Sequence, residues 1–449
     1  MKRVYDFMPH WIQSMLVSAW AIGTNARKYG PVFWGAMDEL ERNESRTSEE
    51  MNDLRSNKLR QVLREAKRDV PFYRDSHCSP ESVESWPIVD RATIAAQPTS
   101  FINERLHKGQ LGCAHTSGTS GTPLSVWFSW TAYQREMAFR WRHRSWGGIA
   151  FGSRGAYLAG HPVVPPDQRR PPFWRRDIIE NRLLMSSYHM SRETLPHYLR
   201  ALREFQPSFI HGYPSSLYLL AIGSSESGIA LRPQAVFAGS ETLLSYQRRA
   251  IEAAFGTRVF NWYGQTELTC NIVECRLGSL HLRSDYGFLE VADDGNMICT
   301  GFNNDAMPLI RYRCGDRAQL SNCACECGLG FPVVHDLEGR TEDYVITREG
   351  YLVGRLDHLF KDAEGVGEAQ IVQSALGEVL IRIVPTANYT GRSETTIRRE
   401  AGQRLGPRTK ITIECVEKIE RGPNGKFRFI VNDVTAEARF PEYPVIGVR

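Results

Sequence analysis

The chain has 449 residues, which is too long for a single hydrophobic core, so two or three domains are expected. Hydrophobic residues make up 42% and charged residues 24%, an ordinary globular composition. The net charge of +4 is dispersed and argues against nucleic acid as a partner. Two basic clusters with aromatics, 140–146 and 169–176, are interpreted as solvated faces or anion-facing loops. Ten cysteines in so long a chain do not form a disulfide scaffold, and the cytoplasm is the default compartment.

The first apolar run, 11–23, predicts a helix that is amphipathic or packs against the rest of the chain. It contains Gln13 and is shorter than the roughly 20 apolar residues that span a bilayer, so no transmembrane segment is expected. Pro9 and His10 precede the run, and no small-residue cleavage site is evident, which argues against a signal peptide. Contact with a membrane surface is the alternative to packing.

The next part of the chain predicts an α/β architecture. Leucines and a valine at helical spacing predict a helix over 50–69, which Pro71 ends. Strand-like runs then alternate with helical segments, as expected for largely parallel, buried strands. The predicted strands are 156–160, 208–213, 235–241 and 258–264, and the predicted helices are 193–205, 215–224 and 245–255. Ligands of such sheets bind beyond the carboxyl ends of the strands, where the polar segments HGYPSS, GSE and YGQTE fall.

The pattern changes twice in the second half. After Ser284 it consists of short strands and turns, with Asp294-Gly295 as a hairpin turn. After Arg340 it becomes strand-rich, with a helix near 393–405, and is long enough for a small domain. We therefore expect a large N-terminal α/β domain over 1–340, with helices over 1–70, and a small C-terminal α+β domain over 341–449.

The segment TSGTSGTPL, 116–124, is the strongest motif. Gly118 and Gly121 allow successive amides to turn inward as an anion-binding nest. A flexible linker is the alternative, but Pro123 and the apolar flanks favour a tight phosphate-binding turn between two buried strands. The loop has no lysine, so a cation for the phosphates must come from elsewhere. Its hydroxyl donors are Thr116, Ser117, Thr119, Ser120 and Thr122.

Three later segments carry complementary chemistry. YGQTE, 263–267, offers an aromatic ring for a base and Glu267 for Mg²⁺. RYRCGD, 311–316, ends in Asp316, which can accept both hydroxyls of a ribose. ERGPNGKFR, 420–428, places Lys426 on a turn and can supply the missing cation. Each one alone also fits a packed ring, a turn-shaping carboxylate or a solvated lysine.

In this order, and with EGR at 338–340, the motifs resemble those of the adenylate-forming (AMP-forming) acyl-CoA synthetase superfamily. The segments VPFYR, WPIVDRATI, HGYPSSL and QIVQSALGEVLIRIV resemble its phenylacetate-CoA ligase and CapK-like branch. The resemblance runs from about the first helix nearly to the end. Segment 347–355 is similar to the CapK-like version and lacks the form seen in phenylacetate-CoA ligases.

The resemblance implies a hinge just after Arg340 and a mobile small domain that carries the catalytic Lys426. It implies activation of a carboxylic acid with ATP and Mg²⁺ to an acyl-adenylate, with transfer to CoA. Transfer to an amine or hydroxyl in surface-polysaccharide assembly is the alternative, and a non-catalytic nucleotide-binding protein is a remote one. Catalytic roles fall on Lys426, Glu267 and Thr116. Nucleotide-binding roles fall on the loop 117–122, on Gly239, Ser240 and Glu241, on Tyr263, Gly264, Gln265 and Thr266, and on Asp316 and Arg340.

The acid itself is not specified by the sequence. Candidate walls of its pocket are Tyr157, His161, Tyr213 and Pro214, and His161 is equally compatible with a structural role.

A second constellation, within 270–330, is typical of a metal site. Cys323, Cys325 and Cys327 form an alternating triplet, and Cys275 and His281 stand upstream. Some members of the branch look similar, with a Cys and a His upstream of a CxCG. Matching that pattern gives Cys275, His281, Cys325 and Cys327 as ligands of a structural Zn²⁺ and leaves Cys323 as an extra. Free buried cysteines are the alternative.

Overall fold

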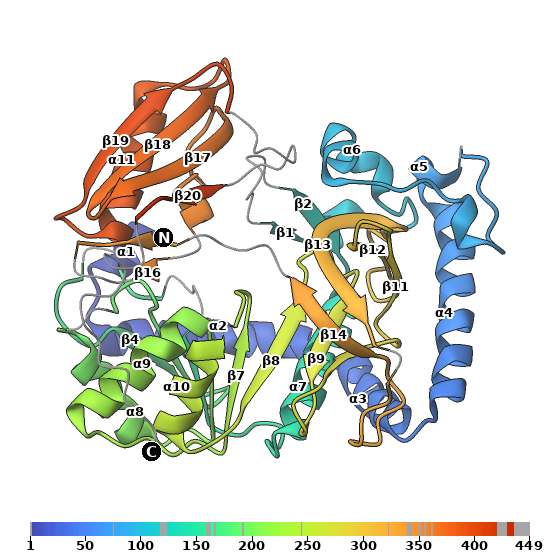
Figure 1. Ribbon diagram of the computed structural model, residues 1–449, viewed down its shortest axis with the longest axis horizontal. Coiled ribbons are helices and arrows are strands. Elements are labelled where there is room, and N and C mark those ends of the chain that lie inside the picture. Colours follow the sequence, from blue (N-terminus) through green and yellow to red (C-terminus); the bar gives the residue numbers. More distant parts are fainter. Residues whose placement is uncertain are drawn as a thin grey trace. The chain divides into compact units, whose positions relative to one another are not determined.

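The computed structural model describes residues 2–74, 76–116, 124–158, 163–165, 168–190, 193–243, 245–321, 323–338, 344–348, 352–353, 356–360, 362–419 and 429–434. The chain divides into two compact units. The large unit comprises residues 1–116 and 125–340, and the small unit contains residues 341–449 (Figure 1).

Helices form the N-terminal part of the large unit. The predicted helix 50–69 is confirmed as α4, and it begins with a capping box. The Thr47 hydroxyl accepts from the Glu50 amide at 3.2 Å, and the Glu50 carboxylate accepts from the Thr47 amide at 2.8 Å. The N-terminal helices are α1 (Lys2–Asp6), α2 (His10–Lys28), α3 (Pro31–Glu44), α4 (Ser48–Asp69) and α5 (Pro71–Arg74).

A twelve-stranded mixed sheet forms the centre of the large unit. Its strand order is β11-β12-β13-β14-β10-β9-β8-β7-β6-β3-β5-β4. The strands are β3 (Gly155–Leu158), β4 (Trp174–Asp177), β5 (Arg182–Met185), β6 (Phe209–Gly212), β7 (Ala235–Gly239), β8 (Val259–Gly264), β9 (Asn271–Glu274), β10 (Leu280–Leu282), β11 (Gly287–Val291), β12 (Asn296–Gly301), β13 (Tyr312–Leu320) and β14 (Val333–Glu338). The predicted parallel arrangement holds for β5, β3, β6, β7 and β8, and the remaining pairs are antiparallel.

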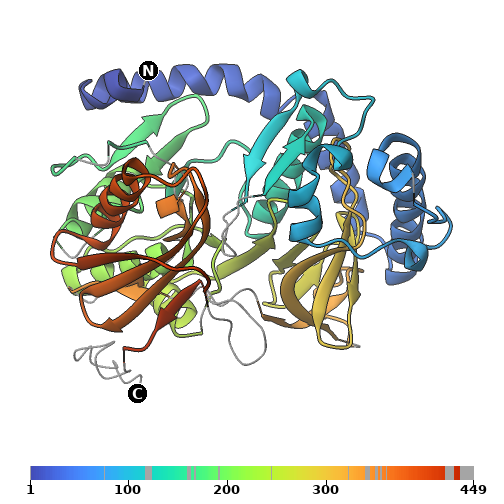
Figure 2. The same cartoon turned by 90° about the horizontal axis from the view of Figure 1, so that it is seen from above.

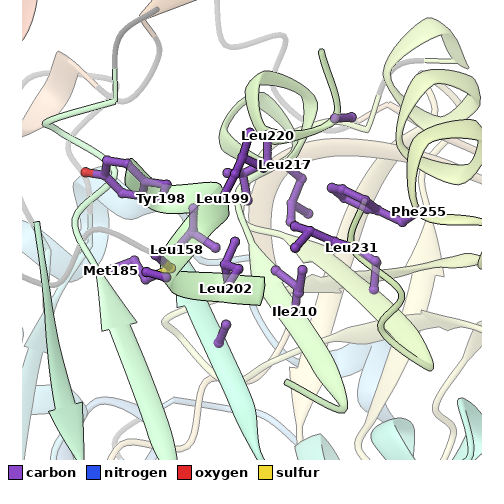
Figure 3. Close-up of a cluster of buried hydrophobic side chains, with 14 of the residues drawn as sticks. Leu158, Met185, Tyr198, Leu199, Leu202, Ile210, Leu217, Leu220, Leu231 and Phe255 are labelled. Atoms are coloured by element: carbon purple, nitrogen blue, oxygen red, sulfur yellow. The ribbon is translucent and has the colours of Figure 1, made fainter. Parts of the chain in front are cut away.

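Both faces of the parallel part are covered, because apolar side chains alternate along each strand. In β6, Phe209 points to one core and Ile210 to the other, and β7 repeats this with Phe237 and Val236. Helices α8 (Leu195–Phe205), α9 (Pro214–Ser227) and α10 (Ser245–Phe255) pack on the Ile210 side (Figure 3). Helices α3 and α7 (Trp130–Trp146) pack on the other side. The predicted helices 193–205, 215–224 and 245–255 are therefore confirmed within a few residues, and the α/β class is confirmed.

The strands that flank the predicted phosphate loop differ from expectation. β1 (Gly112–His115) and β2 (Ser125–Phe128) pair as an antiparallel ribbon separate from the twelve-stranded sheet. The expectation of two buried strands is wrong, because β1 alternates half-buried and exposed residues and β2 buries only Val126. Residues 117–123 between them lie outside the described part of the chain.

The remaining short helices of the large unit lie between α5 and β1. They are η1 (Val83–Ser85), α6 (Arg91–Ala96), η2 (Pro98–Phe101) and η3 (Lys108–Gln110). The Asp90 carboxylate caps the N-terminus of α6 by accepting a hydrogen bond of 2.8 Å from the Thr93 amide.

The small unit is an α+β arrangement. Its four-stranded sheet has the order β19-β18-β17-β20, and helix α11 begins near the predicted position. Apolar residues of β17, β18 and α11 form its core, among them Ile371, Ile381 and Ile397. The elements are β15 (Val345–Ile346), β16 (Leu352–Val353), η4 (Leu356–Phe360), β17 (Val366–Ala375), β18 (Glu378–Pro385), α11 (Gly391–Leu405), β19 (Lys410–Cys415) and β20 (Ile430–Asn432). Across the described residues of both units, we find no helix with the length and apolarity needed to cross a bilayer.

Candidate active site

Polar residues gather at the carboxyl ends of three neighbouring parallel strands. Gly212 of β6 pairs with Ala238 of β7, and Gly239 of β7 pairs with Trp262 of β8. The residues that follow these pairs therefore lie at one level, at the carboxyl edge of the parallel strands. They are Tyr213 and Pro214 after β6, Ser240 and Glu241 after β7, and Tyr263 to Glu267 at the end of β8.

The Glu241 carboxylate joins two of these strand ends. It accepts a hydrogen bond of 3.1 Å from the Ser215 amide in the first turn of α9, where the helix dipole favours negative charge. The preceding Ser240 has a positive φ of 68°, a left-handed turn that re-aims the chain as β7 ends. This places the Gly239–Glu241 segment against the β6–α9 turn.

Tyr263 and Asp316 connect β8 with β13. The Tyr263 hydroxyl donates to the Asp316 carboxylate at 2.6 Å, and the Gln265 amide nitrogen donates to the same hydroxyl at 2.7 Å. The Thr269 hydroxyl donates in turn to the Gln265 side-chain oxygen. Burial, followed by the Asp316 charge, raises the pKa of Tyr263 well above its usual value. The phenol therefore stays protonated and remains a donor to the carboxylate.

Glu267 makes a second connection between the same two motifs. Its buried carboxylate accepts a hydrogen bond of 2.9 Å from the Tyr312 hydroxyl. Tyr312 begins β13, four residues before Asp316. Both acids that the sequence singled out are therefore held by tyrosines, each from the other's motif. A carboxylate near the end of a parallel sheet offers the oxygen ligands that Mg²⁺ prefers.

The sheet must bend strongly to bring these motifs together. Four strand steps separate β8 from β13, which would be about 19 Å in a flat sheet. Two glycines permit the close approach that the bend requires. A Cβ on Gly301 would lie 2.5 Å from the Leu268 carbonyl oxygen, and one on Gly287 would lie 2.3 Å from the Thr269 carbonyl oxygen. Strands β11 and β12 therefore pack directly on the backbone that follows YGQTE.

The segment before α6 links RYRCGD to the start of the phosphate loop. Val89 donates its amide to the Arg311 carbonyl at 3.1 Å and accepts from the Arg313 amide at 2.9 Å, as a parallel bridge beside β13. Two residues later, the Arg91 guanidinium donates to the Thr116 hydroxyl at 2.6 Å. Thr116 is buried at the end of β1. One segment thus connects RYRCGD and Thr116 to each other.

The four predicted metal ligands lie together beside the turn that connects β9 with β10. Cys275 follows β9, His281 lies in β10, and Cys325 and Cys327 lie between β13 and β14. Their ligand atoms all lie within 4.8 Å of one another. The Cys275 and Cys325 sulfurs are 3.9 Å apart, and the Cys327 sulfur is 3.3 Å from His281 Nε2.

Two turns of the same construction present the sulfurs. In Cys275–Gly278 and Cys325–Gly328 the fourth amide donates to the first carbonyl, and each glycine has a positive φ. In each turn the third amide points at the first sulfur, at 3.4 and 3.5 Å. His281 Nδ1 faces the Phe331 carbonyl at 3.0 Å, which leaves Nε2 directed at the sulfurs.

This donor set fits a tetrahedral zinc ion. Zinc–sulfur bonds of about 2.3 Å imply sulfur–sulfur distances near 3.8 Å across a tetrahedron. The observed separation of 3.9 Å is close to that value and far too long for a disulfide. Cys323 is exposed and does not belong to the group.

Several known proteins are similar to this chain in sequence or in fold. Residues 345–433 match the CapK C-terminal domain family. Protein CapK of Staphylococcus aureus is 25% identical over 458 residues, which cover 97% of this chain and all of that protein. Phenylacetate-coenzyme A ligase of Thermus thermophilus is 29% identical over 166 residues, covering 33% of this chain and 37% of the relative.

The chain is similar to proteins of the phenylacetate-CoA ligase and CapK-like branch of the adenylate-forming (AMP-forming) ligases. Indoleacetate--lysine synthetase of Pseudomonas savastanoi is 28% identical over 129 residues, covering 28% of this chain and 32% of that protein. The fold agrees with the crystal structure of a 2-hydroxyisobutyryl-CoA ligase, at 19% identity, with a TM-score of 0.57 and coverage of 88% and 92%.

The predicted residues of the nucleotide and acid sites fall into four groups. Tyr263, Gln265 and Asp316 form one hydrogen-bonded network, and Glu267 is tied to it through Tyr312. Gly239, Ser240, Glu241, Tyr213, Pro214, Gly264 and Thr266 lie at the strand ends. Tyr157 packs in the core of β3, with its ring 5.7 Å from those of Phe209 and His211. Ser117, Gly118, Thr119, Ser120, Gly121, Thr122, His161, Arg340 and Lys426 lie outside the described residues.

Two residues of the site were not singled out by sequence reasoning. Tyr312 is inside RYRCGD, but a tyrosine at the start of a strand is usually interpreted as a core residue. Arg91 is inside WPIVDRATI, where the only signal was the position of an arginine just after the Asp90 helix cap. Its partner, Thr116, lies 25 residues away along the chain.

Proposed function

We propose that this protein activates a carboxylic acid with ATP and transfers the acyl group to an acceptor. In the first step a carboxylate oxygen attacks the α-phosphorus, the bond between the α-phosphorus and the bridging oxygen breaks, and pyrophosphate leaves. In the second step the acceptor attacks the acyl carbonyl, and AMP leaves with the electron pair. The observation that carries this proposal is the paired contact of Tyr263 with Asp316 and of Glu267 with Tyr312.

The site residues would bind and orient the nucleotide. Asp316 exchanges its Tyr263 partner for the ribose hydroxyls, and the protonated Tyr263 stays beside them as a ring against the base. Arg340 supports the ribose, and Gly239, Ser240 and Glu241 line the adenine pocket with Gly264, Gln265 and Thr266. Glu267 holds Mg²⁺, which when bound offsets the charge of the phosphates. Thr116 and residues 117–122 contribute hydroxyls and amides to the phosphates.

Adenylation of this kind requires positioning and charge offset more than proton transfer. We assign the mobile cation to Lys426, on a small domain that closes for adenylation and reorients about a hinge after Arg340 for transfer. The acid would lie against Tyr213 and Pro214, with Tyr157 and His161 as further walls.

CoA is the first candidate acceptor, supported by the similarity to phenylacetate-coenzyme A ligase. An amine is the second candidate, supported by the similarity to an indoleacetate--lysine synthetase. A hydroxyl of a sugar in surface-polysaccharide assembly is the third, supported by the full-length similarity to CapK. The cluster of Cys275, His281, Cys325 and Cys327 would hold a structural zinc, because four protein ligands leave no open position.

The deciding experiment is ATP–pyrophosphate exchange with a panel of aryl, acyl, amino and uronic acids and no acceptor present. Acid-dependent exchange is expected. Lys426→Ala should raise the barrier to adenylation by about 3 kcal/mol, which slows exchange on the order of a hundredfold. The control Lys410→Ala changes an exposed lysine of the same unit and should leave exchange intact. ATP binding without exchange for any acid would instead support a non-catalytic nucleotide-binding protein. Product analysis with CoA, lysine or a sugar present then identifies the acceptor.

A further inference from the structure

Helix α2 has its polar side inside and its apolar side outside. Gln13, Ser18 and Lys28 are buried, whereas Trp20 is 65% exposed. The other large exposed apolar side chains of the helix are Trp11, Met15, Leu16 and Ile22. A surface helix of a globular protein normally shows the reverse pattern. The apolar face is therefore not a core face of the large unit.

Specific polar contacts hold the helix in this orientation. Arg175 of β4 donates through Nε to the Gln13 side-chain oxygen at 2.6 Å. The Ser18 hydroxyl accepts from the Ile178 amide at 3.2 Å, and Lys28 forms an ion pair of 2.5 Å with Glu180. Buried polar groups satisfied in this way are costly to rearrange. The outward direction of the apolar face is thus fixed by its polar side.

The exposed apolar residues continue beyond α2 on both sides. Before it stand Val4 and Phe7, which are largely exposed. Beside it lies Ile178, directly after the edge strand β4 and exposed although its amide is bonded to Ser18. Figure 2 shows α2 along one margin of the large unit. We call this set of Val4, Phe7, Trp11, Met15, Leu16, Trp20, Ile22 and Ile178 the α2 face.

The charges around the α2 face are mainly positive. Asp6, next to Phe7, is the only acidic residue in the sequence from 1 to 37. Among the described residues of α2 and of 168–182, the exposed charged side chains are Arg27, Arg169, Arg170 and Arg176. The acids of the same segments, Asp177 and Glu180, are engaged in ion pairs with Arg182 and Lys28. The basic cluster 169–176 thus lies beside the apolar face.

We propose that the α2 face binds the surface of an anionic lipid bilayer, with α2 lying in the interface. A helix with tryptophans and aliphatic side chains on one side and arginines nearby fits this surface chemically. A second copy of the chain fits less well. The described residues of α2 and 168–182 offer no exposed acidic side chain that could pair with these arginines in a partner copy. The proposal does not depend on adenylation, since its test reads binding alone.

The test is co-sedimentation of the full chain with vesicles of phosphatidylcholine containing phosphatidylglycerol, and with vesicles of phosphatidylcholine alone. Binding to the anionic vesicles is expected. Trp11→Ser combined with Trp20→Ser should lower the partition coefficient by about tenfold or more. Trp11→Phe combined with Trp20→Phe should retain binding. The matched control, Val291→Ser with Leu320→Ser, removes exposed apolar residues elsewhere in the same unit and should bind normally.

A second arm separates the lipid charge from the apolar contribution. Arg170→Gln combined with Arg176→Gln should remove most of the difference between anionic and neutral vesicles. Quenching of tryptophan fluorescence by brominated lipid should fall in the Trp11 and Trp20 serine variant. Absence of vesicle binding by the wild-type chain would overturn the proposal. It would also be overturned if the wild type self-associates, the serine variant is monomeric and neither binds vesicles.

Discussion

The Tyr263 hydroxyl donates to the Asp316 carboxylate at 2.6 Å across 53 residues of sequence. This contact joins the end of the last parallel strand, β8, to an antiparallel strand four positions along a bent sheet. Burial raises the pKa of Tyr263 well above its usual value, so the phenol keeps its proton and presents it to the carboxylate. A ribose that enters the site would offer two hydroxyl donors where Tyr263 offers one.

Asp316→Asn should therefore impair nucleotide use. We expect kcat/KM for ATP to fall by 10- to 100-fold, on the order of 1.5–3 kcal/mol for a hydrogen bond to a charged group. Tyr263→Phe should have a smaller effect, because the ribose hydroxyls replace the lost donor while the ring remains.

Steady-state exchange kinetics over a range of ATP concentrations measure both variants. Asp293→Asn, an exposed carboxylate at the β11–β12 turn, is the control and should be unchanged. Equal losses for Asp293→Asn and Asp316→Asn would contradict a specific role for Asp316.

The proposed zinc site predicts one zinc per chain by elemental analysis. Cys327→Ser should abolish it, because the Cys327 sulfur lies 3.3 Å from His281 Nε2 at the centre of the cluster. Cys323→Ser should keep full zinc content, since Cys323 is exposed and outside the cluster. A chelator should lower the thermal midpoint of the wild type and of Cys323→Ser alike. The site would be contradicted if protein from cells grown with added zinc contained no zinc and its thermal midpoint did not change with the chelator.

Much of the fold could be predicted from the sequence, because hydrophobic periodicity is a local signal. The strands β6, β7 and β8 and the helices between them lie close to their predicted ranges. Polar segments directly after those strands had to meet at one edge, which brought Tyr213, Ser240 and Tyr263 into the predicted site. The two cysteine turns were also accessible, since each is encoded by a short cysteine and glycine spacing.

The remaining features depend on distant partners. The bend that brings Asp316 to Tyr263 rests on Gly287 and Gly301, whose close contacts lie elsewhere in the chain. The Arg91 to Thr116 bond depends on Val89 pairing beside β13. The orientation of α2 is set by Arg175 and Glu180 of the β4 region. An apolar run in a sequence reveals that a helix has an apolar side, but not which way that side faces.

The bend itself predicts a stability effect. Gly301→Ala places a methyl group 2.5 Å from the Leu268 carbonyl oxygen, and the backbone must shift to admit it. We expect a loss of about 1–3 kcal/mol in the free energy of unfolding, measured by urea denaturation. Gly23→Ala in helix α2 is the matched control, because nothing lies within 4 Å of the Cβ that the alanine would add. It should be neutral or stabilising by up to about 1 kcal/mol. A Gly301→Ala variant as stable as wild type would show that the close approach is not required.

Buried His143 predicts a dependence of stability on pH. The side chain is enclosed by the aromatic rings of Phe237 and Trp262, and its Nε2 is 3.0 Å from the Glu274 carbonyl oxygen. Burial lowers the pKa of His143 from 6.5 to about 3. Between these values the unfolded chain binds a proton that the folded chain does not, so stability falls as pH falls from about 6.5 towards 3. The contribution is complete above the unfolded pKa and declines by at most about 1.4 kcal/mol per pH unit below it.

Urea unfolding at a series of pH values between 7 and 4 measures this slope. His143→Gln retains a donor for the Glu274 carbonyl but does not titrate, so its free energy of unfolding should decline less steeply than that of the wild type. His107→Gln changes an exposed histidine and should leave the wild-type slope intact. Taking the difference between variant and wild type cancels the titration of other groups, including Glu274. Parallel profiles for His143→Gln and the wild type would mean that His143 is not neutral in the folded protein.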